Sequence, residues 1–303
     1  GKILIILFNL YYYVSMIYHK PSNEKEAVDI LVAEKGVARV LAGGTDILVQ
    51  MRSGVIKPNL IVDIKSLPGI KSITKTTDGY EIGAAVSGFD FNNNDDLKQF
   101  APGIAESFDL IGSTQIQGRC TIGGNLCNAS PAADTVPALI SANCLAKIVG
   151  PNGIRECKVA EITLGPGKTS LNKGEFIKSI IIPGRPNFSA DAYLRFTPRS
   201  EMDIAVVSAA VFLTINEDHL CTDARVSLGA VAPTVVSVQK AASTLIGSKL
   251  SKAVLEAMAK ECSLACNPID DKRGTIEFRS HVAGVLAKRA SLIALKRAGA
   301  TIG

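Results

Sequence analysis

The sequence predicts an α+β fold with about two domains. Its 303 residues exceed the usual size of a single domain. Two apolar stretches each run into a pair of glycines followed by small polar residues, at Gly43-Gly44 and at Gly123-Gly124. Beyond residue 204, strand-like segments come first and helical segments follow, an order typical of a sheet covered by helices.

The first of these glycine pairs lies in a predicted strand–turn–helix. Ser22 is expected to cap a first helix, whose apolar stripe of Ala27, Ile30 and Leu31 ends at Gly36. A strand over 37–41 then leads into the glycine pair, and Asp46 is expected to cap a short helix over 47–52. A strand over 60–64 closes this unit, and the chain crosses into a second one near 67–69.

The rest of the chain is also predicted to contain both strands and helices. Strands are predicted over 80–86, 146–149, 175–182, 204–215 and 224–229. A helix is predicted over 95–111, with a break at Pro102. A short helix is predicted to begin directly after Asp134 or Thr135, with Pro137 in its first turn. Three further helices are predicted over 238–246, 251–266 and 275–297.

Composition limits the classes of function. The net charge is +5, and the densest basic cluster, 288–289 with 296–297, lies near the end of a predicted helix, where it suits a solvated face better than a nucleic-acid site. The seven cysteines include no C-x-x-C pair. Cys262 and Cys266 lie one helical turn apart without a second pair, so free thiols are expected rather than metal ligands. Free thiols favour a cytoplasmic location.

Residues 1–15 are an apolar N-terminal extension of uncertain role. They are too short and too interrupted by polar residues for a membrane span, and no small-x-small cleavage site follows them. We interpret them as translated upstream of a natural start at Met16, and we expect no membrane association.

The two glycine pairs are the strongest candidates for a ligand site. Paired glycines permit positive φ angles and leave no Cβ between backbone N–H groups and a ligand. Either pair alone could be a simple tight turn, but together they could hold the two phosphates of one dinucleotide. Thr45, Thr121 and Asn125 add hydrogen-bonding groups beside them. Neither pair fits G-x-G-x-x-G, so a Rossmann crossover is not supported.

Other candidate residues keep two interpretations each. Asp134 is either a helix cap or a carboxylate for a ribose hydroxyl. For Arg195 and Arg199, which lie near Asp203 in sequence, one interpretation is a simple surface ion pair without a functional role. The segment 165–169 imitates the end of a P-loop but has Ile162 where the motif needs glycine, so a surface loop is expected. No catalytic triad can be argued from spacing.

From Met16 to about Gly299, the chain resembles the FAD-binding subunits of molybdenum hydroxylases, the xanthine dehydrogenase and carbon monoxide dehydrogenase group. The motifs that carry the resemblance, in order, are Ile17-Tyr18-His19-Lys20-Pro21, Ala42-Gly43-Gly44-Thr45-Asp46, Thr121-Ile122-Gly123-Gly124-Asn125, Ala129-Ser130-Pro131-Ala132-Ala133-Asp134, Arg199 with Asp203-Ile204-Ala205, Leu228-Gly229-Ala230-Val231-Ala232-Pro233-Thr234 and Phe278-Arg279.

The resemblance implies a two-part FAD-binding domain of the PCMH/VAO type, with subdomains over 16–67 and 68–185, followed by an α+β C-terminal domain over 186–303. The loops 42–46 and 121–125 would hold the pyrophosphate and Asp134 the adenosine ribose. Arg195 falls where relatives often place a lysine near the flavin.

The resemblance also implies electron transfer within a complex. A small subunit with [2Fe–2S] clusters and a large molybdopterin subunit would be partners, as a dimer of heterotrimers, with NAD or another external acceptor. FAD would be this chain's cofactor, without a metal of its own. The alternatives are a stand-alone NADPH-dependent reductase of the cell-wall type and a non-catalytic dinucleotide-binding assembly protein.

Overall fold

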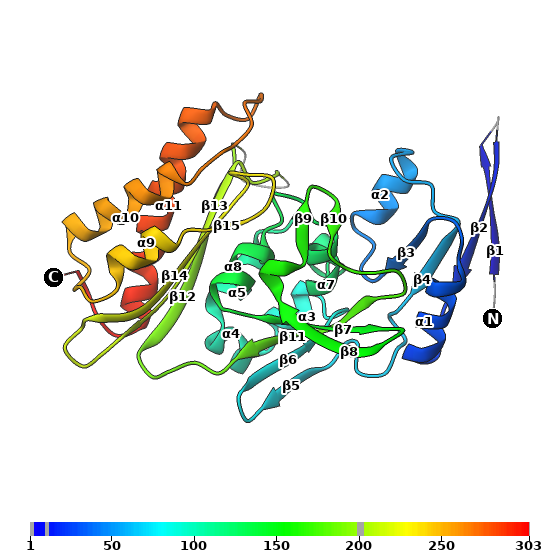
Figure 1. The fold of residues 1–303 in the computed structure, drawn as a ribbon, viewed down its shortest axis with the longest axis horizontal. Helices are drawn as coiled ribbons and strands as arrows, with labels where there is room; N and C mark the ends of the chain where they lie inside the picture. The colour runs from blue at the N-terminus through cyan, green and yellow to red at the C-terminus, as the bar shows by residue number, and fades with distance from the viewer. Residues whose placement is uncertain (1–2, 10–11, 199–202, 303) are drawn as a thin grey trace.

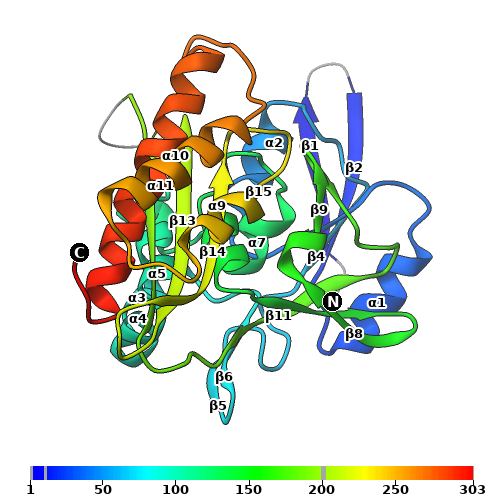
Figure 2. The same cartoon turned by 60° about the vertical axis from the view of Figure 1, so that its left-hand side comes forward.

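The computed structural model describes residues 3–9, 12–198 and 203–302. An N-terminal sheet, a middle sheet and a C-terminal sheet follow one another along the long axis of the molecule (Figure 1). Helices fill the space between the middle and C-terminal sheets, and three more cover the outer face of the C-terminal sheet (Figures 1 and 2). The α+β fold class predicted from the sequence is confirmed.

The N-terminal sheet has the strand order β1-β2-β4-β3, with β2, β4 and β3 parallel and β1 antiparallel to β2. Its elements are β1 (Ile3–Asn9), β2 (Tyr12–His19), α1 (Glu24–Ala33), β3 (Ala38–Leu41), α2 (Ile47–Arg52) and β4 (Leu60–Asp63). The sequence predicted no strand before residue 37, so both β1 and β2 were missed. Residues 17–19 pair with β4, and the extended backbone continues back through Tyr12 to form a hairpin with β1.

The cap of α1 lies one residue later than predicted. The Asn23 side chain, not that of Ser22, accepts a hydrogen bond from the backbone N–H of Glu26. Ser22 instead donates through its N–H and its hydroxyl to the Glu26 carboxylate, at 2.7 and 2.8 Å. Both residues thus fix the first turn, and Ala27, Val28 and Leu31 are buried against the sheet.

The middle sheet is antiparallel throughout, with the order β5-β6-β11-β7-β8. Its strands are β5 (Ile73–Thr76), β6 (Gly79–Gly83), β7 (Leu145–Gly150), β8 (Gly153–Lys158) and β11 (Phe176–Pro183), and a short hairpin is formed by β9 (Thr163–Gly165) and β10 (Lys168–Thr169) after the 3-10 turn η1 (Val159–Glu161).

Short helices connect these strands: α3 (Gly88–Asn92), α4 (Asp95–Phe100), α5 (Pro102–Asp109), α6 (Thr114–Gln117), α7 (Ile122–Cys127) and α8 (Thr135–Ser141). The predicted break at Pro102 is confirmed, because α5 begins on this proline, where its missing N–H costs nothing.

The C-terminal sheet, β12-β13-β14-β15, is antiparallel and lies between two helical layers. Its elements are β12 (Ser189–Phe196), β13 (Val207–Ile215), β14 (Cys221–Gly229), β15 (Val236–Ser237), α9 (Gln239–Leu245), α10 (Lys252–Leu264) and α11 (Ile276–Arg297). α9 and α11 pack on one face, and α5 and α8 on the other (Figure 1). None of the helices in the described ranges is long and apolar enough to cross a bilayer.

Two hydrophobic cores share strand β12. Tyr193 belongs to the core built by the N-terminal and middle sheets, whereas Ala190 and Ala192 belong to the core under α9–α11. This alternation follows from the two-residue period of a strand. One strand of the C-terminal sheet therefore completes the core of the preceding part.

Ion pairs reinforce the same boundary. Arg185 holds the buried Asp191 carboxylate through two hydrogen bonds of 2.8 Å, and the N–H of Gly103 donates to Asp191 Oδ1 at 3.1 Å. Arg297 is exposed, as predicted for a solvated face, and it also pairs with Glu106 and donates to the Asp191 carbonyl. These contacts connect α11 and β12 to α5.

Candidate functional site

Both glycine pairs lie on the wall of one cavity of about 890 Å³ between the N-terminal and middle sheets. A volume of this size is typical of a site for a large small-molecule ligand or cofactor. The predicted residues that line the cavity are Ala42, Gly43, Gly44, Thr45, Asp46, Thr121, Gly123, Gly124 and Asn125. Ile122 is fully buried behind the wall, and Asp134 and Arg195 lie elsewhere.

The loop 42–46, called here the first glycine loop, contacts the second at backbone level. A Cβ on Gly43 would lie 1.8 Å from the carbonyl oxygen of Arg119, two residues before Thr121. No side chain fits in that space, so glycine is required for the two loops to meet. Gly44 has the positive φ angle (+83°) that the sequence predicted for such a turn.

The backbone N–H groups of the first glycine loop are free. Within the described part of the chain, no acceptor receives a hydrogen bond from the N–H of residues 43–46. The carbonyls of Gly44 and Asp46 accept from Leu48 and Gln50 and so begin α2. Asp46 occupies the N-cap position, but its side chain makes no cap hydrogen bond, so the predicted capping by its carboxylate is wrong.

The segment 121–125, the second glycine loop, differs from its prediction. It is the first turn of α7, and neither Gly123 nor Gly124 has a positive φ angle. Thr121 caps this helix by accepting from the N–H of Gly124 at 3.1 Å. The N–H groups of Ile122 and Gly123 donate to the carbonyls of Val86 and Ala84, at 3.2 and 3.0 Å. The backbone donors of this loop are therefore already engaged.

Glycine is needed in the second loop for packing. A Cβ on Gly123 would lie 2.7 Å from the Cβ of Ala84, so only glycine lets α7 lie this close to the chain after β6. The Asn125 side chain holds the start of α8, because its Oδ1 accepts from the N–H and the hydroxyl of Thr135, at 3.2 and 2.6 Å. Its amide nitrogen remains available to the cavity.

Several cavity residues were missed by the sequence analysis. The Gln50 side chain donates to Asn128 Oδ1 at 2.9 Å and so connects α2 to the end of α7 across the cavity wall. These neutral amides lie outside any motif. Gly167 and Thr169 were assigned to a surface loop but belong to the β9–β10 hairpin and its turn, and both line the cavity.

Charged groups of both signs line the cavity. Lys35, Arg39 and Lys173 supply positive charge. Glu175 is neutralised by Arg155, which donates two hydrogen bonds of 2.8 and 2.7 Å and lowers the pKa of the carboxyl to about 2. The surrounding wall displaces water from the Asp46 carboxyl and raises its pKa, although the residue as a whole stays exposed. Glu34 also lines the cavity, so Lys35, Arg39 and Lys173 outnumber Glu34 and Asp46 among the residues without an ion pair in the described ranges. This excess of positive charge favours an anionic ligand.

Asp134 and Arg195 form a buried pair at the domain boundary. Arg195 Nη1 lies 2.9 Å from Asp134 Oδ2, and the Tyr193 hydroxyl donates to Asp134 Oδ1 at 2.7 Å. Only 10% of the Asp134 side chain is exposed, and it makes no cap hydrogen bond to α8, so the helix-cap interpretation is wrong. Arg195 pairs with Asp134 and not with Asp203, and Arg199 lies outside the described residues.

The cysteines are free thiols, as predicted. Burial raises the pKa of Cys127, Cys144 and Cys262 to about 12, which keeps these thiols protonated. Within the described ranges, no group of histidine, cysteine or acidic side chains is placed to hold a metal ion.

Two families match successive parts of the chain. Residues 12–185 match the FAD binding domain in molybdopterin dehydrogenase, and residues 192–294 match the CO dehydrogenase flavoprotein C-terminal domain. The chain is 28% identical over 284 residues to the putative xanthine dehydrogenase FAD-binding subunit of Escherichia coli, covering 93% of this chain and 97% of that protein.

A second relative is the carbon monoxide dehydrogenase medium chain of Afipia carboxidovorans, with 32% identity over 276 residues, 90% of this chain and 94% of that one. The fold also matches a chain in the crystal structure of the Cu,Mo-CO dehydrogenase. That match has a TM-score of 0.88 and 31% identity, and covers 92% of this chain and 97% of the other.

Proposed function

Because the chain belongs to the FAD-binding subunits of xanthine and CO dehydrogenase-type molybdenum hydroxylases, we propose that its cavity of about 890 Å³ holds the FAD. When bound, the FAD supplies the redox chemistry, and the protein positions it and tunes it. The observation that carries the assignment is the first glycine loop, because residues 43–46 line the cavity and their four N–H groups have no acceptor within the described residues.

The two loops have unequal roles in this proposal. The N–H groups of residues 43–46 and the Thr45 hydroxyl donate to the pyrophosphate, and Arg39 and Lys173 supply compensating charge. The second glycine loop, residues 121–125, forms the opposite wall and offers the Thr121 hydroxyl and the Asn125 amide. Hydrogen bonds to a charged group are worth more than neutral ones, so free donors matter most at the phosphates.

The proposed roles of the remaining predicted residues follow from their contacts. Ile122 anchors the second loop in the core. Both oxygens of the Asp134 carboxylate already accept hydrogen bonds, from Tyr193 and from Arg195, so a ribose hydroxyl would have to share them. We therefore propose that Asp134 acts mainly in joining the two domains. We place the domains at 16–185, with subdomains 16–67 and 68–185, and at 186–303.

We propose that the chain works with a small [2Fe–2S] subunit and a large molybdopterin subunit, in a dimer of heterotrimers located in the cytoplasm. Electrons pass from the clusters of the small subunit through the FAD to NAD or another external acceptor. Relatives named as medium chains and FAD-binding subunits support this division of labour. The stand-alone reductase and the assembly protein are not favoured, because the match to such subunits spans nearly the whole chain.

The test is the flavin content of the purified full chain. We expect one non-covalent FAD per chain, released intact by acid or heat and identified by mass. The absence of flavin after reconstitution with excess FAD would contradict the proposal. Oxidation of a purine, an aldehyde or carbon monoxide by this chain alone would contradict the division of labour.

A further inference from the structure

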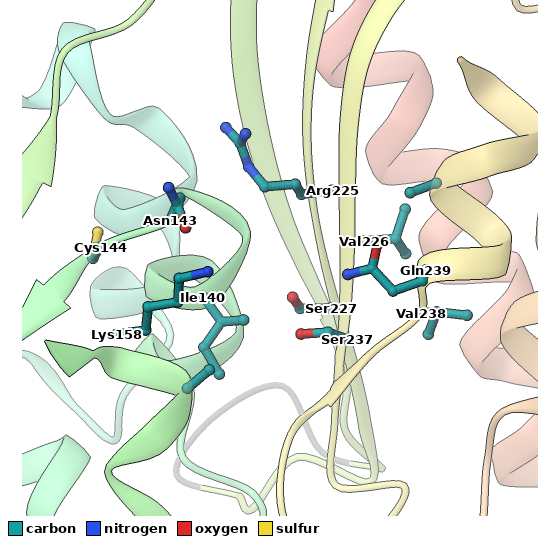
Figure 3. Close-up of a pocket in the computed structure, with 12 residues that line it drawn as sticks. Ile140, Asn143, Cys144, Lys158, Arg225, Val226, Ser227, Ser237, Val238 and Gln239 are labelled. Atoms are coloured by element: carbon teal, nitrogen blue, oxygen red, sulfur yellow. The ribbon is translucent and has the colours of Figure 1, made fainter.

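A second, smaller cavity of about 190 Å³ lies between the two domains (Figure 3), and no residue of either glycine loop lines it. One wall comes from the end of α8, from the chain that follows it and from the end of β8, with Ile140, Asn143 and Lys158. The other comes from β14, β15 and the start of α9, with Ser227, Ser237 and Gln239. The proposed FAD site shares none of these residues.

Four polar side chains line the two sides of this cavity; Lys158, Ser237 and Gln239 are exposed residues, and Ser227 is buried. Figure 3 shows the Lys158 ammonium pointing from one wall toward the Ser227 and Ser237 hydroxyls and the Gln239 amide on the other. Within the described ranges, none of these four side chains makes a hydrogen bond or ion pair to another group.

Ser227 is the most informative of the four. The residue is only 1% exposed, its hydroxyl makes no hydrogen bond within the described ranges, and it points into the cavity (Figure 3). Buried polar groups almost always have a hydrogen-bond partner, so a buried hydroxyl aimed at a cavity indicates that the partner is the cavity's occupant.

The charge of the cavity selects the occupant. Its twelve lining residues, all within the described ranges, include Lys158 and Arg225 but no carboxylate. Arg225 is already engaged, because its Nε donates to the Ser141 carbonyl at 2.7 Å, its Nη1 pairs with Asp223 at 2.5 Å and its guanidinium stacks on Phe212. The uncompensated positive charge at this cavity is therefore that of the Lys158 ammonium, which makes no ion pair within the described ranges.

We propose that this inter-domain cavity binds a small phosphate-class oxyanion. The Lys158 ammonium pairs with its charge, and the hydroxyls of Ser227 and Ser237 and the amide of Gln239 donate to its oxygens. The volume is several times the ~30 Å³ that a water molecule occupies in the liquid, so a phosphate group fits. Because the donors come from both domains, the bound anion favours their packed arrangement by mass action.

The test uses the FAD-loaded full chain, so that the large cavity is filled. Inorganic phosphate is titrated against chloride at constant ionic strength, with the melting temperature and calorimetric binding as readouts. We expect saturable binding at one site per chain, with a melting temperature that rises with phosphate. Lys158→Met should raise the dissociation constant at least tenfold, and Ser227→Ala a few-fold.

A matched lysine variant locates the binding. Lys240→Met removes an exposed charge next to Gln239 but outside the cavity and should bind phosphate like the wild type. Binding that is absent, that is unchanged in Lys158→Met, or that is weakened as much in Lys240→Met as in Lys158→Met would overturn the proposal.

Discussion

The two glycine loops look alike in sequence but use their glycines differently. In the first loop, residues 42–46, Gly44 adopts a positive φ angle and the backbone N–H groups stay free. In the second, residues 121–125, both glycines are helical and the N–H groups of residues 122–124 are bonded within the protein. One loop is organised to donate to a ligand and the other to pack closely, which a Gly-Gly pair by itself does not distinguish.

The largest loss of stability is expected from Asp134→Asn, at the domain boundary. It leaves the buried Arg195 guanidinium without its carboxylate, and breaking a buried ion pair costs about 3–5 kcal/mol. Chemical denaturation should show this loss, and Asp134→Asn combined with Arg195→Met should recover part of it. An Asp134→Asn protein of normal stability but weak FAD binding would instead assign the carboxylate to the ribose.

Gly43→Ala should have the next largest effect, because its Cβ would force the first loop away from the Arg119 carbonyl. Overpacking of about 1–3 kcal/mol corresponds to a loss of about 5- to 140-fold in FAD affinity if the shift falls on the loop. Flavin retention and titration of the apoprotein measure it. Gly165→Ala is the control, because its Cβ would meet no atom within 4 Å and its φ is not positive. Equal FAD affinity in both variants would refute the loop contact.

Gly44→Ala should act through the backbone. A left-handed conformation costs an alanine about 1–2 kcal/mol, and the new Cβ would approach Leu48 Cδ1 at 3.1 Å. We expect a loss of FAD affinity of up to about tenfold, by fluorescence titration, since the N–H groups of the loop would turn. Full affinity with reduced thermal stability would show that this turn supports only the fold.

Gly124→Ala should have the smallest effect. Its Cβ would push the Thr121 hydroxyl, at 2.7 Å, out of its cap position at a cost of about 1 kcal/mol, but alanine gains about as much in helix propensity. The melting temperature and the FAD affinity should therefore stay close to those of the wild type. A loss of flavin as large as in Gly43→Ala would show that the two loops act alike after all.

Much of the fold could be predicted because the apolar periodicity of each segment and the glycine, proline and capping residues at its ends indicate the same helix or strand. The break at Pro102 and the boundaries of α9, α10 and α11 came within two residues of prediction. Strand β12 was missed. Its residues 189–196 alternate between two different cores and so lack the apolar face that marks a strand on one core.

The candidate site was predictable in its position but not in its details. The glycine pairs identified residues that line the cavity. The positive φ angle expected in the second loop is absent, because the backbone conformation there depends on which carbonyls accept from its N–H groups. Those acceptors, the carbonyls of Ala84 and Val86, lie far away in sequence. Two other features are likewise long-range: the contact between Gly43 and Arg119 and the ion pair between Asp134 and Arg195. No local sequence pattern predicts them.

Strand β12 has a consequence for how the molecule unfolds. Tyr193 fills the first core while its neighbours Ala190 and Ala192 fill the second, so neither core closes without the same strand. A segment that contributes to two cores transmits the loss of one to the other. We therefore expect the two domains to unfold as a single cooperative unit in one calorimetric transition, and we expect neither half to fold by itself when the chain is divided at their boundary.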